Sequence, residues 1–98
     1  MDPLRIKPTS LPQRREDVTF HVIDDEALIY DPDRGATHRL NSTARFIWEH
    51  CDGATNCGSI ACELTSVWDA SRQQACDDVL GAVGSMAENG LLKVKRDR

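Results

Sequence analysis

Apolar and β-branched residues are concentrated in three short segments in the first half of the chain, a composition typical of strands. The segments span residues 18–23, 26–30 and 36–40. An Asp-Asp pair at 24–25 separates the first two, and the run 31–35 contains a proline and a glycine, which suit the φ angles of tight turns. Short connections join neighbouring antiparallel strands, so the pattern predicts a three-stranded antiparallel meander.

After residue 40 the apolar positions fall three and four residues apart, which indicates three helices that each bury one face. Asn41 is a strong candidate to cap the first, the second begins at Thr55 or Asn56, and Asp69 or Ser71 caps the third. An Asp-Gly pair and an Asn-Gly pair follow the first and third helices, glycine being the usual residue after a helix. The three apolar stripes consist of Ala44, Ile47, Trp48 and Cys51; of Cys57, Ile60, Ala61, Leu64, Val67 and Trp68; and of Ala75, Cys76, Val79, Leu80, Ala82, Val83, Met86 and Ala87.

The predicted element order is β-β-β-α-α-α, an α+β fold in which helices cover the apolar face of the sheet. The last two helices resemble a helix-turn-helix and the sheet resembles a wing, so the architecture is winged-helix-like. Residues 1–17 combine prolines and charges without hydrophobic periodicity, and we expect a flexible N-terminal arm. The domain itself is predicted at 18–92, with a C-terminal tail at 93–98.

The distribution of charge argues against nucleic acid as a partner. The whole chain of 98 residues carries a formal charge of −4, but the body between residues 18 and 92 has four arginines, no lysine and twelve carboxylates, a net charge of −8. Affinity for phosphate backbones depends on Lys and Arg. The sequence also lacks a transmembrane or secretory hydrophobic segment, so we expect a cytoplasmic protein that binds no membrane.

Four cysteines raise the question of a metal or a disulfide. The spacing of Cys51, Cys57, Cys62 and Cys76 contains no Cys-x-x-Cys pair and matches no zinc or iron–sulfur pattern. We interpret them mainly as packing residues, with a metal or redox role as the alternative. Phosphate-loop, zinc-protease and serine-hydrolase motifs are also missing, and the three histidines fall on different predicted elements. The expectation is therefore a protein that is not an enzyme and has no cofactor.

The third predicted strand, residues 36–40, has one charged residue and no proline or glycine, whereas exposed edges are usually blunted by such residues. Two interpretations stay open: a short solvated edge, or an edge that accepts an extended peptide by β-augmentation. Gly81 and Gly84 lie inside the third helix, where glycine costs about 1 kcal/mol relative to alanine. They allow either the close approach of another chain or tight packing within the domain.

Several stretches resemble the pyrroloquinoline quinone biosynthesis protein D (PqqD) family, over about residues 18–92. The strongest is Leu-Asn-Ser-Thr-Ala at 40–44, leading through Ile47-Trp48 to Asp52-Gly53. The ending Asn-Gly-Leu-Leu at 89–92 is a weaker match. The resemblance implies the same fold of three antiparallel strands and a winged-helix-like set of helices.

The resemblance also implies a function. Members of that family are recognition elements that bind the leader of a ribosomally made precursor peptide and present it to a modifying enzyme, often a radical S-adenosylmethionine (SAM) protein or a leader protease. The leader adds to the third strand, in a cleft against the third helix. Carried over by position, the peptide-binding residues are Ala36, Thr37, His38, Arg39 and Leu40 on the strand and Asp77, Leu80, Gly81, Gly84 and Ala87 on the helix.

Two other functions stay open at this point. One is a winged helix-turn-helix regulator that binds nucleic acid, although the third helix is itself acidic. The other is a scaffold that holds only its partner enzyme. We expect a monomer or a weak dimer.

Overall fold

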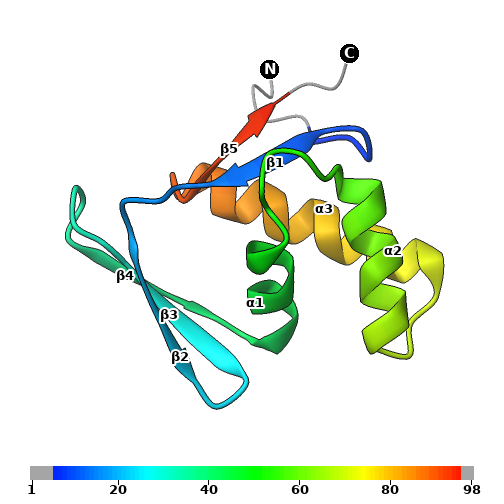
Figure 1. Cartoon of the computed structure of the whole chain (residues 1–98), viewed down its shortest axis with the longest axis horizontal. Helices are drawn as coiled ribbons and strands as arrows, with labels where there is room; N and C mark the ends of the chain where they lie inside the picture. Colours follow the sequence, from blue (N-terminus) through cyan, green and yellow to red (C-terminus); the bar gives the residue numbers. More distant parts are fainter. Residues whose placement is uncertain (1–5, 96–98) are drawn as a thin grey trace.

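The computed structural model describes residues 6–95. It confirms the three-stranded antiparallel sheet and the three helices, and adds a two-stranded sheet (Figure 1). The elements in chain order are β1 (Leu11–Arg14), β2 (Thr19–Ile23), β3 (Glu26–Asp31), β4 (Ala36–Leu40), α1 (Ser42–Glu49), α2 (Cys57–Val67), α3 (Arg72–Glu88) and β5 (Leu92–Lys95).

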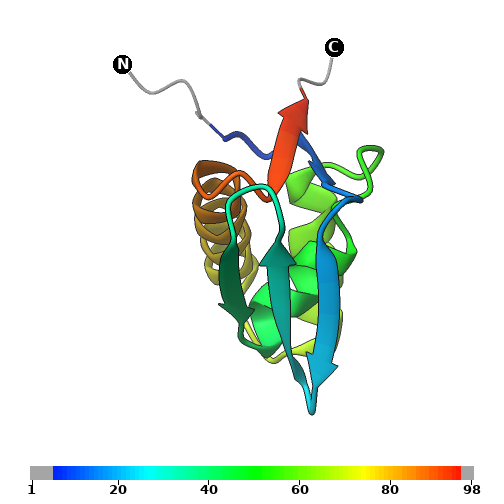
Figure 2. The same ribbon diagram turned by 90° about the vertical axis from the view of Figure 1, so that its left-hand side faces the viewer.

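The larger sheet has the strand order β2-β3-β4, so β3 is central and β4 lies at one edge. Side chains alternate between its two faces. Ala27 and Ile29 of β3 point inward and are almost fully buried, whereas Tyr30 points outward and is 43% exposed. Figure 2 shows this sheet in front of the helices, with β4 on the same side of the molecule as α3.

All three helices begin at a polar side chain that accepts a hydrogen bond from a free backbone N–H of the first turn. Asn41 caps α1 by accepting from the N–H of Ala44 at 2.8 Å. Asn56 caps α2 and Ser71 caps α3 in the same way. Because Asn41 directly follows Leu40, the edge strand passes into α1 without a loop.

The hydrophobic core lies where α1 meets the inner face of the sheet and α3 packs against α1 and β5, while α2 packs along α3. Ile29, Ile47, Ile60, Val79 and Val83 are completely buried within it. Among residues 6–95 we find no helix that could cross a membrane.

The second sheet corrects one expectation. β1 pairs antiparallel with β5, in the register Leu11 opposite Lys95 and Arg14 opposite Leu92. The flexible arm predicted at 1–17 is therefore wrong for residues 11–14, and residues 93–95 of the predicted C-terminal tail belong to β5. Residues 1–5 and 96–98 lie outside the described part of the chain.

Hydrogen bonds attach β1 on both of its sides. Away from β5, the Gly53 N–H donates to the Pro12 carbonyl at 2.8 Å, and the Arg14 N–H donates to the Cys51 carbonyl at 2.9 Å. The side chain of Pro12 is fully buried. The partners of β1 lie about 40 and 80 residues away along the chain, so the local pattern of residues 11–14 gives no sign of the pairing.

Candidate functional site

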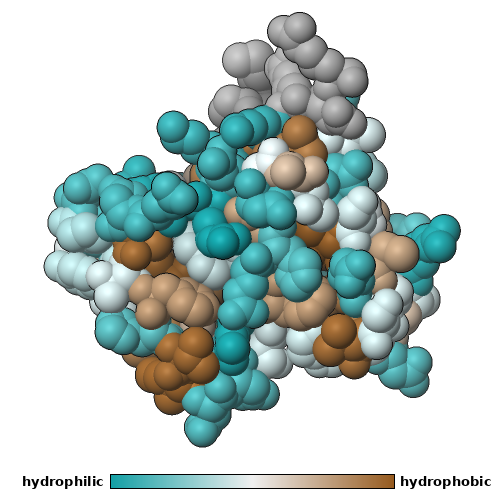
Figure 3. All heavy atoms as spheres, viewed as in Figure 1, coloured by the Kyte–Doolittle hydropathy of each residue, from teal (hydrophilic) through white to brown (hydrophobic). Residues whose placement is uncertain are grey.

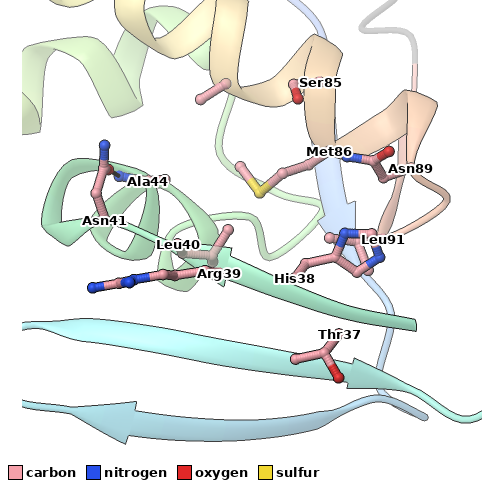
Figure 4. Close-up of a pocket in the computed structure, with 11 residues that line it drawn as sticks. Thr37, His38, Arg39, Leu40, Asn41, Ala44, Ser85, Met86, Asn89 and Leu91 are labelled. Carbon is pink, nitrogen blue, oxygen red and sulfur yellow. Dashed lines mark hydrogen bonds between the residues drawn. The ribbon is translucent and has the colours of Figure 1, made fainter. Parts of the chain in front are cut away.

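A pocket of about 360 Å³ opens between the edge strand β4 and the C-terminal half of α3 (Figure 4). β4, the start of α1, α3 and the turn after α3 all contribute to it. The lining residues are Thr37, His38, Arg39, Leu40, Asn41, Ala44, Ala82, Ser85, Met86, Asn89 and Leu91.

The strand β4 is paired on only one side within the described residues, where it meets β3. Backbone N–H and C=O groups on the other side of such a strand are open to an additional chain. The pocket lies along this open side, so an extended segment added to β4 would run between the sheet and α3.

Alternation along β4 determines which side chains face the pocket interior. His38 is opposite the buried Ile29 and Leu40 is opposite the buried Ala27, so both lie on the inner face. Arg39 lies on the outer face, where its Nε donates to Glu26 Oε1 at 2.7 Å. Its side chain is 75% exposed, so that guanidinium is directed away from the pocket interior.

The two ends of the pocket differ in polarity. Leu40, Ala44 and Met86 form an apolar end (Figure 4). At the other end His38 lies beneath Asn89, and the Nε2 atom of His38 is buried without a hydrogen-bond partner among the described residues.

The turn after α3 is fixed to the sheet by Arg15. Its Nη1 donates to Asp31 Oδ2 at 2.8 Å and to the Gly90 carbonyl at 3.1 Å, and its backbone N–H donates to the Leu91 carbonyl. The hydrogen bond from Arg15 keeps the pKa of Asp31 below its ordinary value of 3.8, and the Asp31 side chain has no exposed surface. This ion pair holds the pocket wall at Leu91 in place.

Two of the cysteines lie in the core rather than at the pocket. Burial raises the pKa of the Cys51 thiol to about 12 and that of Cys57 to about 11. Both are therefore protonated at neutral pH and pack as small apolar groups. Cys76 is half-buried and Cys62 is exposed. Within residues 6–95 no three His, Cys, Asp or Glu side chains cluster as metal ligands would.

The structure brings together only part of the predicted site. Residues 37–40 line the pocket, while Ala36 begins β4 just outside the lining. The helix residues predicted to contact a peptide, Asp77, Leu80, Gly81, Gly84 and Ala87, do not line this pocket, and their role in binding stays a prediction. The α3 residues in the lining, with the turn residue after it, are Ala82, Ser85, Met86 and Asn89.

Gly84 shows how α3 is oriented within the domain. A Cβ added there would lie 3.9 Å from Cγ1 of Ile6, so this flank of α3 faces the segment before β1. A Cβ at Gly81 would meet nothing within 4 Å. The apolar period of a helix identifies its buried stripe, but does not say which flank faces the edge strand. The small or polar residues Ala82, Ser85 and Asn89, spaced three and four residues apart, are the only sequence feature that marks this face of α3, and such a pattern is common.

Comparisons with known proteins agree with this architecture. The family model of coenzyme PQQ synthesis protein D (PqqD) matches residues 26–92. A search of curated proteins found no match. Among solved structures, the PqqD truncation of Methylobacterium extorquens PqqCD, described as a functional and stand-alone recognition element for ribosomally synthesised and post-translationally modified peptides, superposes with a TM-score of 0.78 at 20% identity. That match covers 95% of this chain and 99% of the other.

Two further structures are complexes with leader peptides. A lasso peptide synthetase B1 matches with a TM-score of 0.74 at 25% identity, over 85% of this chain and 98% of that one. TbiB1, in complex with the TbiA(beta) leader peptide, matches with a TM-score of 0.74 at 18% identity, over 83% and 94%. The family match extends from β3 to the start of β5 and so includes every element around the pocket. The chain belongs to the coenzyme PQQ synthesis protein D (PqqD) family.

Proposed function

We propose that this protein binds the leader of a ribosomally synthesised precursor peptide by β-augmentation on β4, and presents it to a modifying enzyme such as a radical SAM protein or a leader protease. The observation on which the proposal depends is the open edge of β4 beside the pocket with α3. The protein itself performs no catalysis in this proposal.

The geometry suits an extended peptide for two reasons. The unpaired backbone groups of β4 provide affinity that does not depend on sequence, and a pocket that takes alternate side chains provides selectivity. Leu40 and His38 are two residues apart and both lie on the inner face of β4. The pocket is therefore long enough to take two side chains of a bound strand, at positions two residues apart.

The comparisons support this function. Two of the matched proteins were solved with leader peptides bound. One of them is 25% identical to this chain, and the match covers 98% of that protein's chain. The third is described as a stand-alone recognition element. A protein of the same fold and family with an open β4 edge is suited to the same role.

The surface of α3 supports a peptide rather than nucleic acid as the ligand. A recognition helix needs cations and amides at the groove of the duplex. Asp77, Asp78 and Glu88 are exposed along α3, while Arg72 at its start is its one cation. We also propose the cytoplasm as the working compartment, which the four free cysteines support because disulfides are rare there.

Calorimetric titration tests the proposal. The probes are synthetic leader segments from the short open reading frames that flank the gene, a scrambled version of each, and a 20-base-pair duplex. We expect one leader to bind saturably at a 1:1 ratio, its scrambled version to bind more weakly, and the duplex to produce no heat. Binding of the duplex with no response to any leader would overturn the proposal.

A further inference from the structure

The spacing of inward-facing residues on β4 defines two positions for side chains of a bound strand. Side chains two residues apart in a strand lie on the same face, about 6.6 Å apart. An added strand paired with β4 would place one inward side chain beside Leu40 and another, two residues along, beside His38. The pocket therefore contacts two side chains of the leader, from residues two positions apart.

The position beside Leu40 is apolar. Leu40 is 5% exposed and Met86 is 4% exposed, and Ala44, which has a small side chain, lines the pocket near them. Figure 4 shows the Met86 side chain directed from α3 toward this end of β4. An aliphatic or aromatic side chain of the peptide would fill it.

The position beside His38 is polar and its hydrogen-bonding capacity is unused. The Nε2 atom of His38 is buried and has no partner among the described residues. None of the hydrogen bonds within residues 6–95 uses the side chain of Ser85 or Asn89, which line the same end. A buried polar atom without a partner is unfavourable, so a ligand that supplies one gains affinity.

We propose that His38 determines specificity in this pocket by selecting leader segments with an apolar residue and, two positions away, a neutral hydrogen-bonding residue: Asn, Gln, Ser or Thr. This inference rests on the proposed function and names the peptide that the same site takes. A neutral imidazole has one donor and one acceptor nitrogen, and an amide or hydroxyl can serve either.

The charges around the pocket decide against a carboxylate at this position. The one cation in the lining is Arg39, whose guanidinium is directed to the outer face and paired with Glu26. A carboxylate beside His38 would meet no guanidinium or ammonium group from the lining, so its transfer out of water would be poorly compensated. Neutral polar residues avoid this cost.

The test is selection from a displayed library of random 12-residue peptides against the full chain. Four proteins are compared: wild type, His38→Phe, Ala82→Leu and His21→Phe. His38→Phe keeps a ring of similar size and removes both nitrogens. Ala82→Leu fills the pocket, so peptides that bind wild type but not this variant are the ones that bind in the pocket. His21→Phe makes the same change on the outer face of β2, away from the pocket, and is the matched control.

We consider the peptides whose binding is lost in Ala82→Leu. Those selected on wild type and on His21→Phe should carry an apolar residue and, two positions away, a neutral polar residue. On His38→Phe the polar preference should disappear and the apolar one remain. The best wild-type peptide should bind His38→Phe roughly two- to tenfold more weakly, as expected for one hydrogen bond. Thermal unfolding should show the variant to be no less stable, because it removes a buried nitrogen without a partner; if it does not fold, His38→Leu replaces it.

The outcomes separate this inference from the proposed function. An unchanged polar preference on His38→Phe, or enrichment of acidic or apolar residues at that position on wild type, overturns the role of His38 alone. If no enriched peptide depends on Ala82, then the pocket does not bind extended peptides, and the proposed function fails together with this inference.

Discussion

Ala82 sets the width of the pocket from the side of α3. It is half-buried and lines the pocket opposite β4, where a larger side chain would take the space of an added strand. Alanine is also the best helix former, so its small size has no cost for α3 itself. Pocket width and helix stability can therefore be changed separately at this residue.

We predict that Ala82→Leu weakens leader binding roughly five- to hundredfold, because overfilling a packed site typically costs about 1–3 kcal/mol. The fold should persist, since leucine is also a good helix former. Fluorescence anisotropy with a labelled leader measures the affinity, and thermal unfolding measures the stability. Gln73→Leu, at an exposed position of α3 outside the pocket, is the matched control. Equal affinities for both variants would show that the peptide does not pass between β4 and α3.

At the residue scale, sequence reasoning succeeded where a local rule applies. Asn41 and Ser71 were among the predicted caps and Asn56 among the predicted helix starts, because capping depends on a residue and its next three neighbours. The α3 residues that line the pocket could not be identified from the sequence, because they depend on how the helix is rotated against the sheet. Gly81 and Gly84 suggested a close approach, but Gly84 faces Ile6 instead of β4.

At the scale of elements, the three strands, the three helices and their order follow from hydrophobic periods of two and of three to four. The strand β4 was predicted with the bounds that it has, Ala36–Leu40. The pair of β1 and β5 was missed because each strand has four residues and finds its partner far along the chain. Proline at position 12 further hides β1, since proline is rare inside sheets.

The attachment of β1 leads to a prediction about truncation. Removal of residues 1–14 should lower the free energy of unfolding by about 2–5 kcal/mol, because it removes several interstrand hydrogen bonds and the buried side chain of Pro12. Urea unfolding followed by circular dichroism measures the change. Thr9→Ala, an exposed position in the same segment, should stay within about 0.5 kcal/mol of wild type. A truncated protein as stable as wild type would restore the interpretation of a flexible arm.

At the scale of the whole molecule, the two sheets meet around the turn after α3. Arg15 links β1 to Asp31 at the end of β3, and its hydrogen bonds to Gly90 and Leu91 fix the pocket wall. Arg34 adds a hydrogen bond to the Asn89 carbonyl.

Figure 3 shows apolar atoms on the face over the β2–β3 hairpin, where Val22 and Ile23 are about half exposed.

The Arg15–Asp31 pair makes stability depend on pH in a definite direction. Because the folded-state pKa of Asp31 lies below its ordinary value of 3.8, the pair stabilises the protein above that value, and the contribution is lost as the pH falls toward the folded-state pKa. Asp31→Asn should therefore lower the melting temperature at pH 7, with a smaller difference from wild type at pH 3. Asp33→Asn, which removes an exposed partner of the same arginine, should have little effect at either pH. If Asp31→Asn lowers the melting temperature by the same amount at pH 7 and at pH 3, the ion pair is not the source of the pH dependence.

The central claim, that β4 receives the leader as an added strand, is tested most directly by chemical-shift mapping. Unlabelled leader is titrated into uniformly ¹⁵N-labelled protein, and backbone amide shifts are followed to saturation. We predict that the largest changes fall on Ala36–Leu40, with smaller ones at Ala82, Ser85 and Asn89 and none along α2 (Cys57–Val67). Largest changes on residues 6–17 or on α2, with β4 unaffected, would contradict the account.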